Sequence, residues 1–249
     1  QKRWDPLLQK ELDWTVELQV EERDLKMRCW GTLFAHMTGF FSINLGHVLQ
    51  RYCNRQLGRP LMTFLVVPGM YMGQMALFRI FRTVRVRIVS SYNARIRQEL
   101  GYGKDDFVPL EIYEDRMLQE PEKFGKAYAM RRWDQELYEA ENDIAGLSLS
   151  FLLVQACCLV ITGLLPDTSG TEEGAGLRDV SCMARLLAIG ALVVLGIFGS
   201  ANIMAENFEG EQMPGTMKSF LKRCLSVFES MLSFSFAWCL LYVSKWSIA

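Results

Sequence analysis

The stretch IAGLSLSFLLVQACCLVITGLL, residues 144–165, runs for 22 residues without a charged side chain. A helix rises ~1.5 Å per residue, so about 20 apolar residues cross a hydrocarbon core ~30 Å thick. Four more stretches meet or approach that length, at residues 29–49, 61–78, 186–204 and 224–243. The sequence therefore predicts an all-α, multi-spanning membrane protein with five transmembrane helices.

The remaining sequence is strongly charged, although the 249 residues carry a net charge of only −1. This balance gives no basic face for nucleic acid, so we expect no nucleic-acid partner. The charged and apolar segments divide the chain into four parts. They are an N-terminal arm (1–28), a two-helix membrane hairpin (29–82), a helical connector (83–143) and a three-helix membrane region (144–249).

Lys and Arg alternate in density between the spans. Residues 79–143 hold twelve of them and residues 1–28 hold six, whereas residues 166–185 hold two. The positive-inside rule then places the N-terminus and the connector in the cytoplasm. Cys53 and Cys182 would share the opposite side, either bridged or as two free thiols. Because the chain opens with Gln1 and stops soon after the last span, we expect a piece of a longer protein.

Local signals predict where the helices of the arm and the connector begin and end. Asp5-Pro6 is a good helix start, whereas the alternation over residues 15–20 predicts a non-helical part of the arm. The helix that continues span two should break at Gly101, and Asp105 or Asp106 should cap a short helix to about residue 118. Pro121 should start a helix that continues into span three.

A basic pattern, LFRIFRTVRVRIV, occupies residues 77–89. Arg79, Arg82 and Arg85 recur every third residue and Arg87 follows, which resembles the charged fourth segment of voltage-sensor domains. However, 18 apolar residues precede the first arginine, and span one offers no acidic partner. We therefore interpret the pattern as a cytoplasmic basic flank that binds anionic lipid headgroups, with a voltage-responsive helix as the alternative.

Several polar residues lie inside spans, where each is costly unless it is paired or used. Span one holds both histidines, three turns apart, and span five holds a carboxylate five residues inside its start. Residues of span four should lie at a similar depth. We predict a transport path lined by spans one, four and five, formed by His36, Asn44, His47, Asn202, Glu206 and Glu229. Glu229 could instead pair with Lys222 or Arg223.

Span two contains Pro68, which predicts a kink, and Gly69-x-x-x-Gly73, which favours close packing of another helix. Just before span three, carboxylates cluster at Glu136, Glu139, Glu141 and Asp143. They are either a solvated face balanced by arginines or a divalent-cation site. A weak similarity between the starts of spans one and five would fit an internal repeat.

No catalytic motif, cofactor motif or metal-ligand spacing is present in the sequence, so we predict that the protein is not an enzyme and needs no cofactor or metal. The leading hypothesis is a transport-type domain, carrier or channel. The alternative is a structural or accessory subunit of a larger membrane complex. A lipid- or voltage-sensing module built on the arginine helix is a third. Expected partners are the lipid bilayer, anionic headgroups, and further copies or other subunits.

Overall fold

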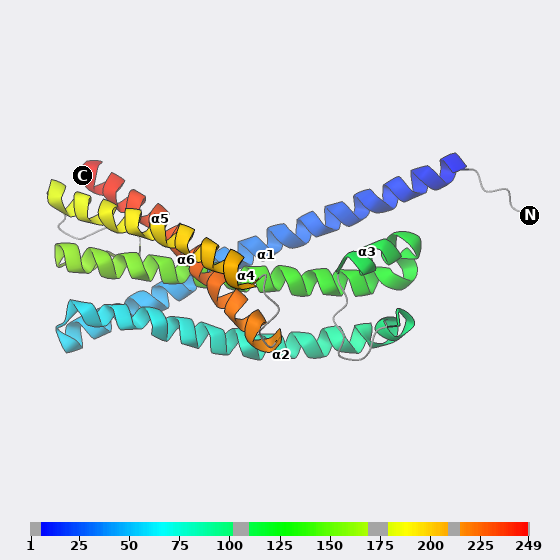
Figure 1. The fold of residues 1–249 in the computed structure, drawn as a ribbon, viewed down its shortest axis with the longest axis horizontal. Helices are drawn as coiled ribbons and strands as arrows, with labels where there is room; N and C mark the ends of the chain where they lie inside the picture. Colours follow the sequence, from blue (N-terminus) through cyan, green and yellow to red (C-terminus); the bar gives the residue numbers. More distant parts are fainter. Residues whose placement is uncertain (1–5, 102–109, 169–178, 209–214, 249) are drawn as a thin grey trace, which may run out of the picture. The chain divides into compact units, whose positions relative to one another are not determined.

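The computed structural model describes residues 6–101, 110–168, 179–208 and 215–248, and over these ranges the protein is helical without strands. Side chains are described mainly over residues 21–88, 124–168, 179–199 and 223–248. Figure 1 shows the helices, which are listed here in chain order: α1 (Pro6–Leu57), a 3₁₀ turn η1 (Pro60–Leu65), α2 (Val66–Glu99), α3 (Leu110–Gln119), α4 (Pro121–Thr162), α5 (Val180–Phe208) and α6 (Gly215–Ile248). The all-α prediction is confirmed.

The helix ends follow the local signals in most places. α1 begins at Pro6, α2 ends at Glu99, and Gly101 then takes a positive φ of 79°, which favours glycine. α4 begins at Pro121 and continues without a break to Thr162, as predicted. Residues 105 and 106 lie outside the described ranges, so their predicted cap stays untested.

Two local predictions are wrong. The arm is helical through residues 15–20, because the short alternation there is outweighed by the helix on either side. Pro68 does not kink the middle of a span, because the chain first forms η1 and α2 starts only at Val66. Pro68 therefore lies in the first helical turn, where a missing amide hydrogen costs no intrahelical bond.

The chain forms two compact units. The first contains residues 1–34 and 77–140, and the second contains residues 35–76 and 141–249. In the first unit, Tyr113, Phe124, Ala127 and Tyr128 form a small apolar core between α3 and α4.

Ion pairs join α1, α2 and α4 within the first unit. Arg132 of α4 pairs with Asp24 of α1 at 3.6 Å and with Glu136 at 2.9 Å. Glu136 also accepts from Arg28 at 3.2 Å, and the Tyr128 hydroxyl donates to Asp24 at 2.5 Å. The charged connector is thus ordered by specific pairs of opposite charge.

An exposed pair lies on α1 of the same unit. Lys26 Nζ donates to Glu22 Oε1 at 2.6 Å. This hydrogen bond, together with the charge of Lys26, lowers the pKa of the Glu22 carboxyl.

Among the described residues, four helical segments are long and apolar enough to cross a bilayer, so this is an integral membrane protein. They are Pro60–Ile88, Phe124–Thr162, Val180–Gly199 and Arg223–Ile248. The α4 segment is the most enclosed, with 78% of its apolar window buried against 28% or less in the other three. Within the second unit, α4 is therefore the central helix.

The first predicted span, residues 29–49, is not among the four. The stretch is helical as part of α1, but His36, Asn44 and His47 lower its mean hydropathy. Helix length and hydropathy therefore support four spans, and the fifth stays a prediction.

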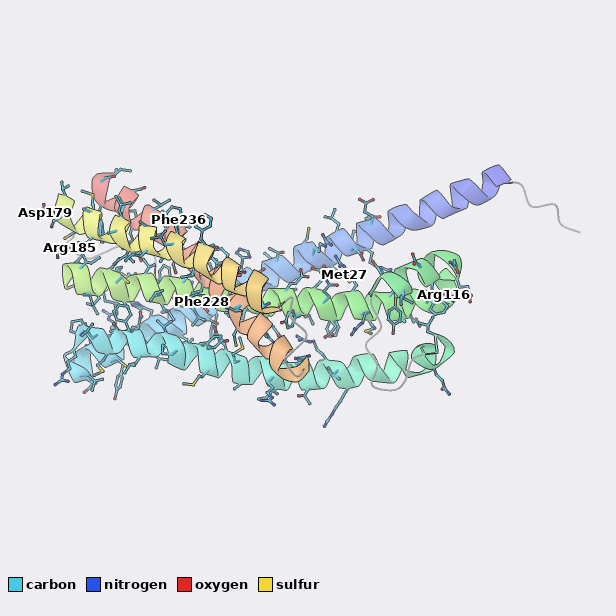
Figure 2. All side chains as sticks on the ribbon, in the orientation of Figure 1. Met27, Arg116, Asp179, Arg185, Phe228 and Phe236 are labelled. Atoms are coloured by element: carbon cyan, nitrogen blue, oxygen red, sulfur yellow. The ribbon has the colours of Figure 1, made fainter. Side chains whose placement is uncertain are left out.

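Close helix contacts in the second unit use small residues. A Cβ added at Gly39 of α1 would stand 2.8 Å from Leu147 Cδ2 of α4, and one at Gly146 would stand 2.7 Å from Ser230 Cβ of α6. α5 and α6 run side by side in Figure 1, and Phe236 of α6, labelled in Figure 2, lies 3.5 Å from where a Cβ of Gly190 would stand.

Candidate functional site: a buried polar column on α4

The buried polar side chains of the second unit concentrate on one helix. Glu141, Ser148 and Gln155 of α4 are 5%, 0% and 0% exposed. They are spaced by seven residues, close to two helical turns, so they lie on one face over ~21 Å of helix. We call these three residues and their partners Arg223, Gln74 and His47 the α4 polar column.

Each of the three α4 residues contacts a different helix. Arg223 of α6 donates to Glu141 Oε2 at 2.7 Å, and Gln74 of α2 donates to Ser148 Oγ at 2.7 Å. Gln155 Nε2 lies 3.4 Å from Nδ1 of His47 in α1 and donates to the carbonyl of Pro166 at 2.9 Å. The column therefore runs along the central helix and includes side chains from α1, α2 and α6.

A further amide, that of Gln50, lies beside the column. Gln50 is fully buried, and its Nε2 donates to the backbone carbonyl of Leu152 at 2.8 Å. The same nitrogen lies 3.5 Å from the carbonyl of Thr63. Gln50 thereby connects α1, η1 and α4 through one side chain.

In the column and beside it lie four buried hydrogen-bond acceptors that no donor reaches among the described residues. They are Oε1 of Gln50, Gln74 and Gln155, and Oδ1 of Asn142. Leaving a buried acceptor unsatisfied costs ~1–3 kcal/mol, and a bilayer core offers no water to replace it. Such oxygens match a species that brings its own donor or positive charge, such as water, a protonated solute or a small cation.

Of the predicted path residues whose side chains are described, only one lies in this column. His47 is buried beside Gln155, whereas His36 and Asn44 are exposed although they lie on the same helix. The side chains of Asn202 and Glu206 are not among those described. Glu229 is half-buried, and Arg223, its predicted partner, pairs with Glu141 instead.

The arginine helix divides into one inward and three outward residues. Arg79, Arg82 and Arg87 are exposed, whereas Arg85 is buried and donates to Asp134 of α4 at 3.2 Å. Span one, the neighbouring span considered from the sequence, offers no acidic partner. The partner comes from the connector helix instead.

Gly69 and Gly73 make no close contact within the described chain, because an added Cβ at either position would meet no atom within 4 Å. Their predicted role in packing against another helix therefore stays a prediction. Cys53 and Cys182 are free thiols.

The acidic residues before span three are divided among separate partners. Glu136 pairs with arginines, Glu139 accepts from Gln135 at 3.0 Å, and Glu141 belongs to the column. The described residues contain no group of three metal-ligating side chains.

Comparisons with protein-family models, with curated proteins and with solved structures give no match to this chain. The column must therefore be interpreted from its own chemistry. It offers a neutralised ion pair at Glu141, a hydroxyl and an amide at mid-helix, and an imidazole and an amide near the end of α4.

Proposed function

We propose that the protein is a transport-type membrane protein, carrier or channel, in which the α4 polar column forms the path. The observation that carries the proposal is the set of four buried oxygen acceptors around α4, two on α4 itself and one each on α1 and α2. Packing alone favours full satisfaction of buried polar groups. A column with four such oxygens in it or beside it is better suited to a passing hydrated or protonated species.

The chemistry of the column favours donors and cations over anions. Gln74 and Gln155 of the column each keep a buried oxygen without a donor, whereas its one orphan nitrogen, Arg223 Nε, belongs to a charge that lies 2.7 Å from the Glu141 carboxylate that offsets it. An anion would meet acceptor oxygens and no unpaired positive charge. We therefore expect protons carried by water, small cations or neutral solutes with N–H or O–H groups.

The proposal includes a fifth span formed by α1 and a cytoplasmic N-terminus. α1 exposes large apolar side chains, among them Met37, Phe41 and Val48 at 61%, 72% and 61%. A helix face of this kind is unfavourable in water and favourable in a bilayer. The density of Lys and Arg in residues 1–28 and 79–143 supports the orientation.

Water access to the column is the direct test, because it needs no knowledge of the solute. In vesicles, Ser148→Cys should react with a small charged methanethiosulfonate, detected as added mass on the intact protein above that of the parent. Ala156→Cys is the control, because Ala156 is equally buried on α4 but lies off the column face. A Ser148→Cys thiol as inert as the control would refute the path.

A flux measurement then identifies the transported species. Vesicles holding a pH-sensitive dye or a potassium gradient should leak protons or K⁺ through the parent protein, and Gln155→Leu should abolish that leak. Asn44→Leu is the matched control, because Asn44 is a polar residue exposed on α1. Equal flux in both variants would place the path elsewhere.

A second candidate function is that of an accessory subunit in a larger membrane complex. It is favoured by the open face around Gly69 and Gly73, which packs against nothing in the described chain. Such a subunit would elute from mild detergent with other proteins in fixed ratio, whereas an autonomous transporter would elute alone or as a small homo-oligomer. In both roles the exposed side chains of Arg79 and Arg82 can bind anionic lipid headgroups. Neither role requires a catalytic residue.

A further inference from the structure

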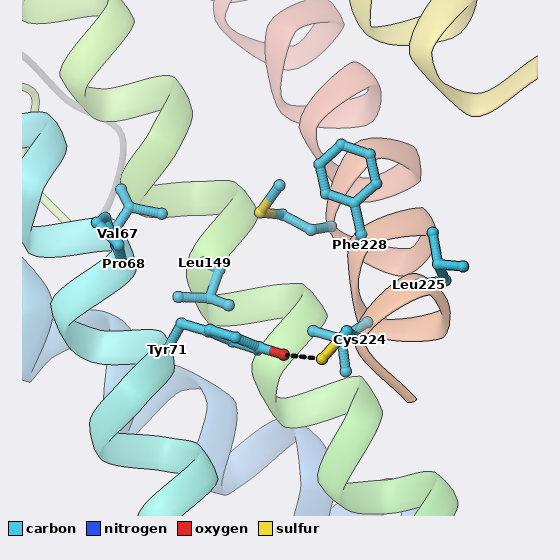
Figure 3. A pocket seen from close by; sticks show the side chains of 9 residues that line it. Val67, Pro68, Tyr71, Leu149, Cys224, Leu225 and Phe228 are labelled. Atoms are coloured by element: carbon cyan, nitrogen blue, oxygen red, sulfur yellow. Dashed lines mark hydrogen bonds between the residues drawn. The ribbon is translucent and has the colours of Figure 1, made fainter. Parts of the chain in front are cut away.

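A cavity of about 450 Å³ lies between α2, α4 and α6 of the second unit (Figure 3). Its walls are almost entirely apolar, and the volume is within the ~300–1,000 Å³ of small-molecule sites. The residues that form its three walls include Val67, Tyr71, Leu149, Cys224, Phe228 and Met231.

The polar atoms of the cavity are already satisfied by each other. The Tyr71 hydroxyl lies 3.1 Å from Cys224 Sγ, drawn as the dashed line in Figure 3. No carboxylate or amide lines the cavity among the described residues. Its occupant must therefore gain its affinity from apolar contact, at ~0.8 kcal/mol per buried methylene group.

The surroundings of the cavity are hydrocarbon. Its α2, α4 and α6 walls all belong to segments that are long and apolar enough to cross a bilayer. Pro68 and Phe228 at its edge are exposed, so the cavity opens to the outside of the unit. The molecules available at such an opening are the lipids of the bilayer itself.

The charge next to the cavity indicates which lipid. The start of α6 carries the basic sequence KSFLKRC, in which Lys218 and Lys222 precede the cavity residue Cys224, whereas Arg223 is neutralised by Glu141. Phe228 follows Lys222 by six residues, or ~9 Å along the helix. A lipid whose chain enters the cavity thus meets positive charge toward the start of the same helix, where each basic residue favours an anionic headgroup.

We propose that this cavity binds one acyl chain of an anionic phospholipid. The lining of the cavity shares no residue with the α4 polar column, and the proposal does not depend on what the column conducts. It differs from general solvation by lipid because it is concave, formed by three helices, and next to a basic segment.

The test uses the full chain in vesicles that contain a phosphatidylglycerol with a photoactivatable diazirine in its acyl chain. After irradiation, mass spectrometry should locate the adducts on residues 67–71 and 224–231. Met231→Trp, which fills the cavity, should lose them. Leu240→Trp is the matched control, because Leu240 is exposed on α6 outside the cavity, and it should label like the parent.

Three results would overturn the proposal. Adducts spread evenly over exposed positions of α5, such as Leu192 and Phe198, would mean ordinary lipid solvation. Equal labelling by a phosphatidylcholine with the same chain would remove the anionic preference. In the parent protein, where no substitution can disturb folding, unlabelled phosphatidylglycerol should compete with the probe, and a failure to compete would exclude a saturable site.

Discussion

The ion pair between Glu141 and Arg223 should be the most costly polar contact to break in the second unit. The two side chains are 7% and 10% exposed, and the Nη2–Oε2 distance is 2.7 Å. Arg223→Met leaves the Glu141 carboxylate buried without this guanidinium. Because neither charge has ready access to water, the loss should be far larger than for a surface pair.

The size of the effect follows from burial. Removing one partner of a buried pair typically costs about 3–5 kcal/mol, whereas exposed substitutions change stability by about 0.5 kcal/mol or less. Replacing both charges by Met removes the desolvation penalty along with the attraction. The double variant Glu141→Met/Arg223→Met should therefore cost clearly less than the sum of the two single variants.

Unfolding by sodium dodecyl sulfate in mixed micelles, followed by tryptophan fluorescence, gives the free energies. Trp238 and Trp246 pack at the second unit's core and report its loss. Glu139→Gln is the control, because Glu139 is exposed on the same helix. Single variants that cost under about 1 kcal/mol, or a double variant equal to their sum, would contradict the role given to this pair.

Two further pairs of variants each test one contact. Gly146→Ala should destabilise the protein by about 1–3 kcal/mol, because the new Cβ would stand 2.7 Å from Ser230 Cβ. Gly69→Ala is the control and should be neutral or slightly stabilising in the isolated chain, because its Cβ would meet no atom within 4 Å. Equal unfolding midpoints for the two variants would contradict the contact between Gly146 and Ser230. Arg85→Leu should speed protease cleavage of the connector by removing the bond to Asp134 at 3.2 Å, and Arg82→Leu, an exposed change, should not.

Much of the fold could be predicted from local sequence because helix ends depend on nearby residues. Pro121 has no amide hydrogen to lose at a helix start, and Gly101 can adopt the positive φ that ends α2. Apolar length identified four membrane segments, whereas the fifth, at residues 29–49, stays a prediction. Pro68 was misread because its effect depends on where the helix begins, and the preceding 3₁₀ turn moved that start to Val66.

The candidate site was harder to predict because its contacts join distant parts of the chain. The column includes His47 with Gln155, and Gln74 with Ser148, which are 108 and 74 residues apart. Local sequence does not say which face of α1 meets α4, so exposed His36 and buried His47 looked alike. One signal was available, namely the seven-residue spacing of Glu141, Ser148 and Gln155.

The glycines that pack closely were likewise hard to predict from local sequence. Gly69 and Gly73 form the familiar packing pattern and contact nothing in the described chain, whereas Gly39 and Gly146, outside that pattern, make the close approaches. Which glycine is used depends on the position of the central helix. That position is a property of the assembled bundle and not of any one span.

The hydrogen bond from Gln50 to the Leu152 carbonyl can form only late in the synthesis of the chain. The two residues are 102 positions apart, and a ribosome adds ~5–20 residues per second. The amide of Gln50 is therefore made roughly 5–20 s before its acceptor exists. During that interval the Gln50 amide must use another acceptor, and the Thr63 carbonyl, 13 positions later and 3.5 Å away in the folded chain, is made in time.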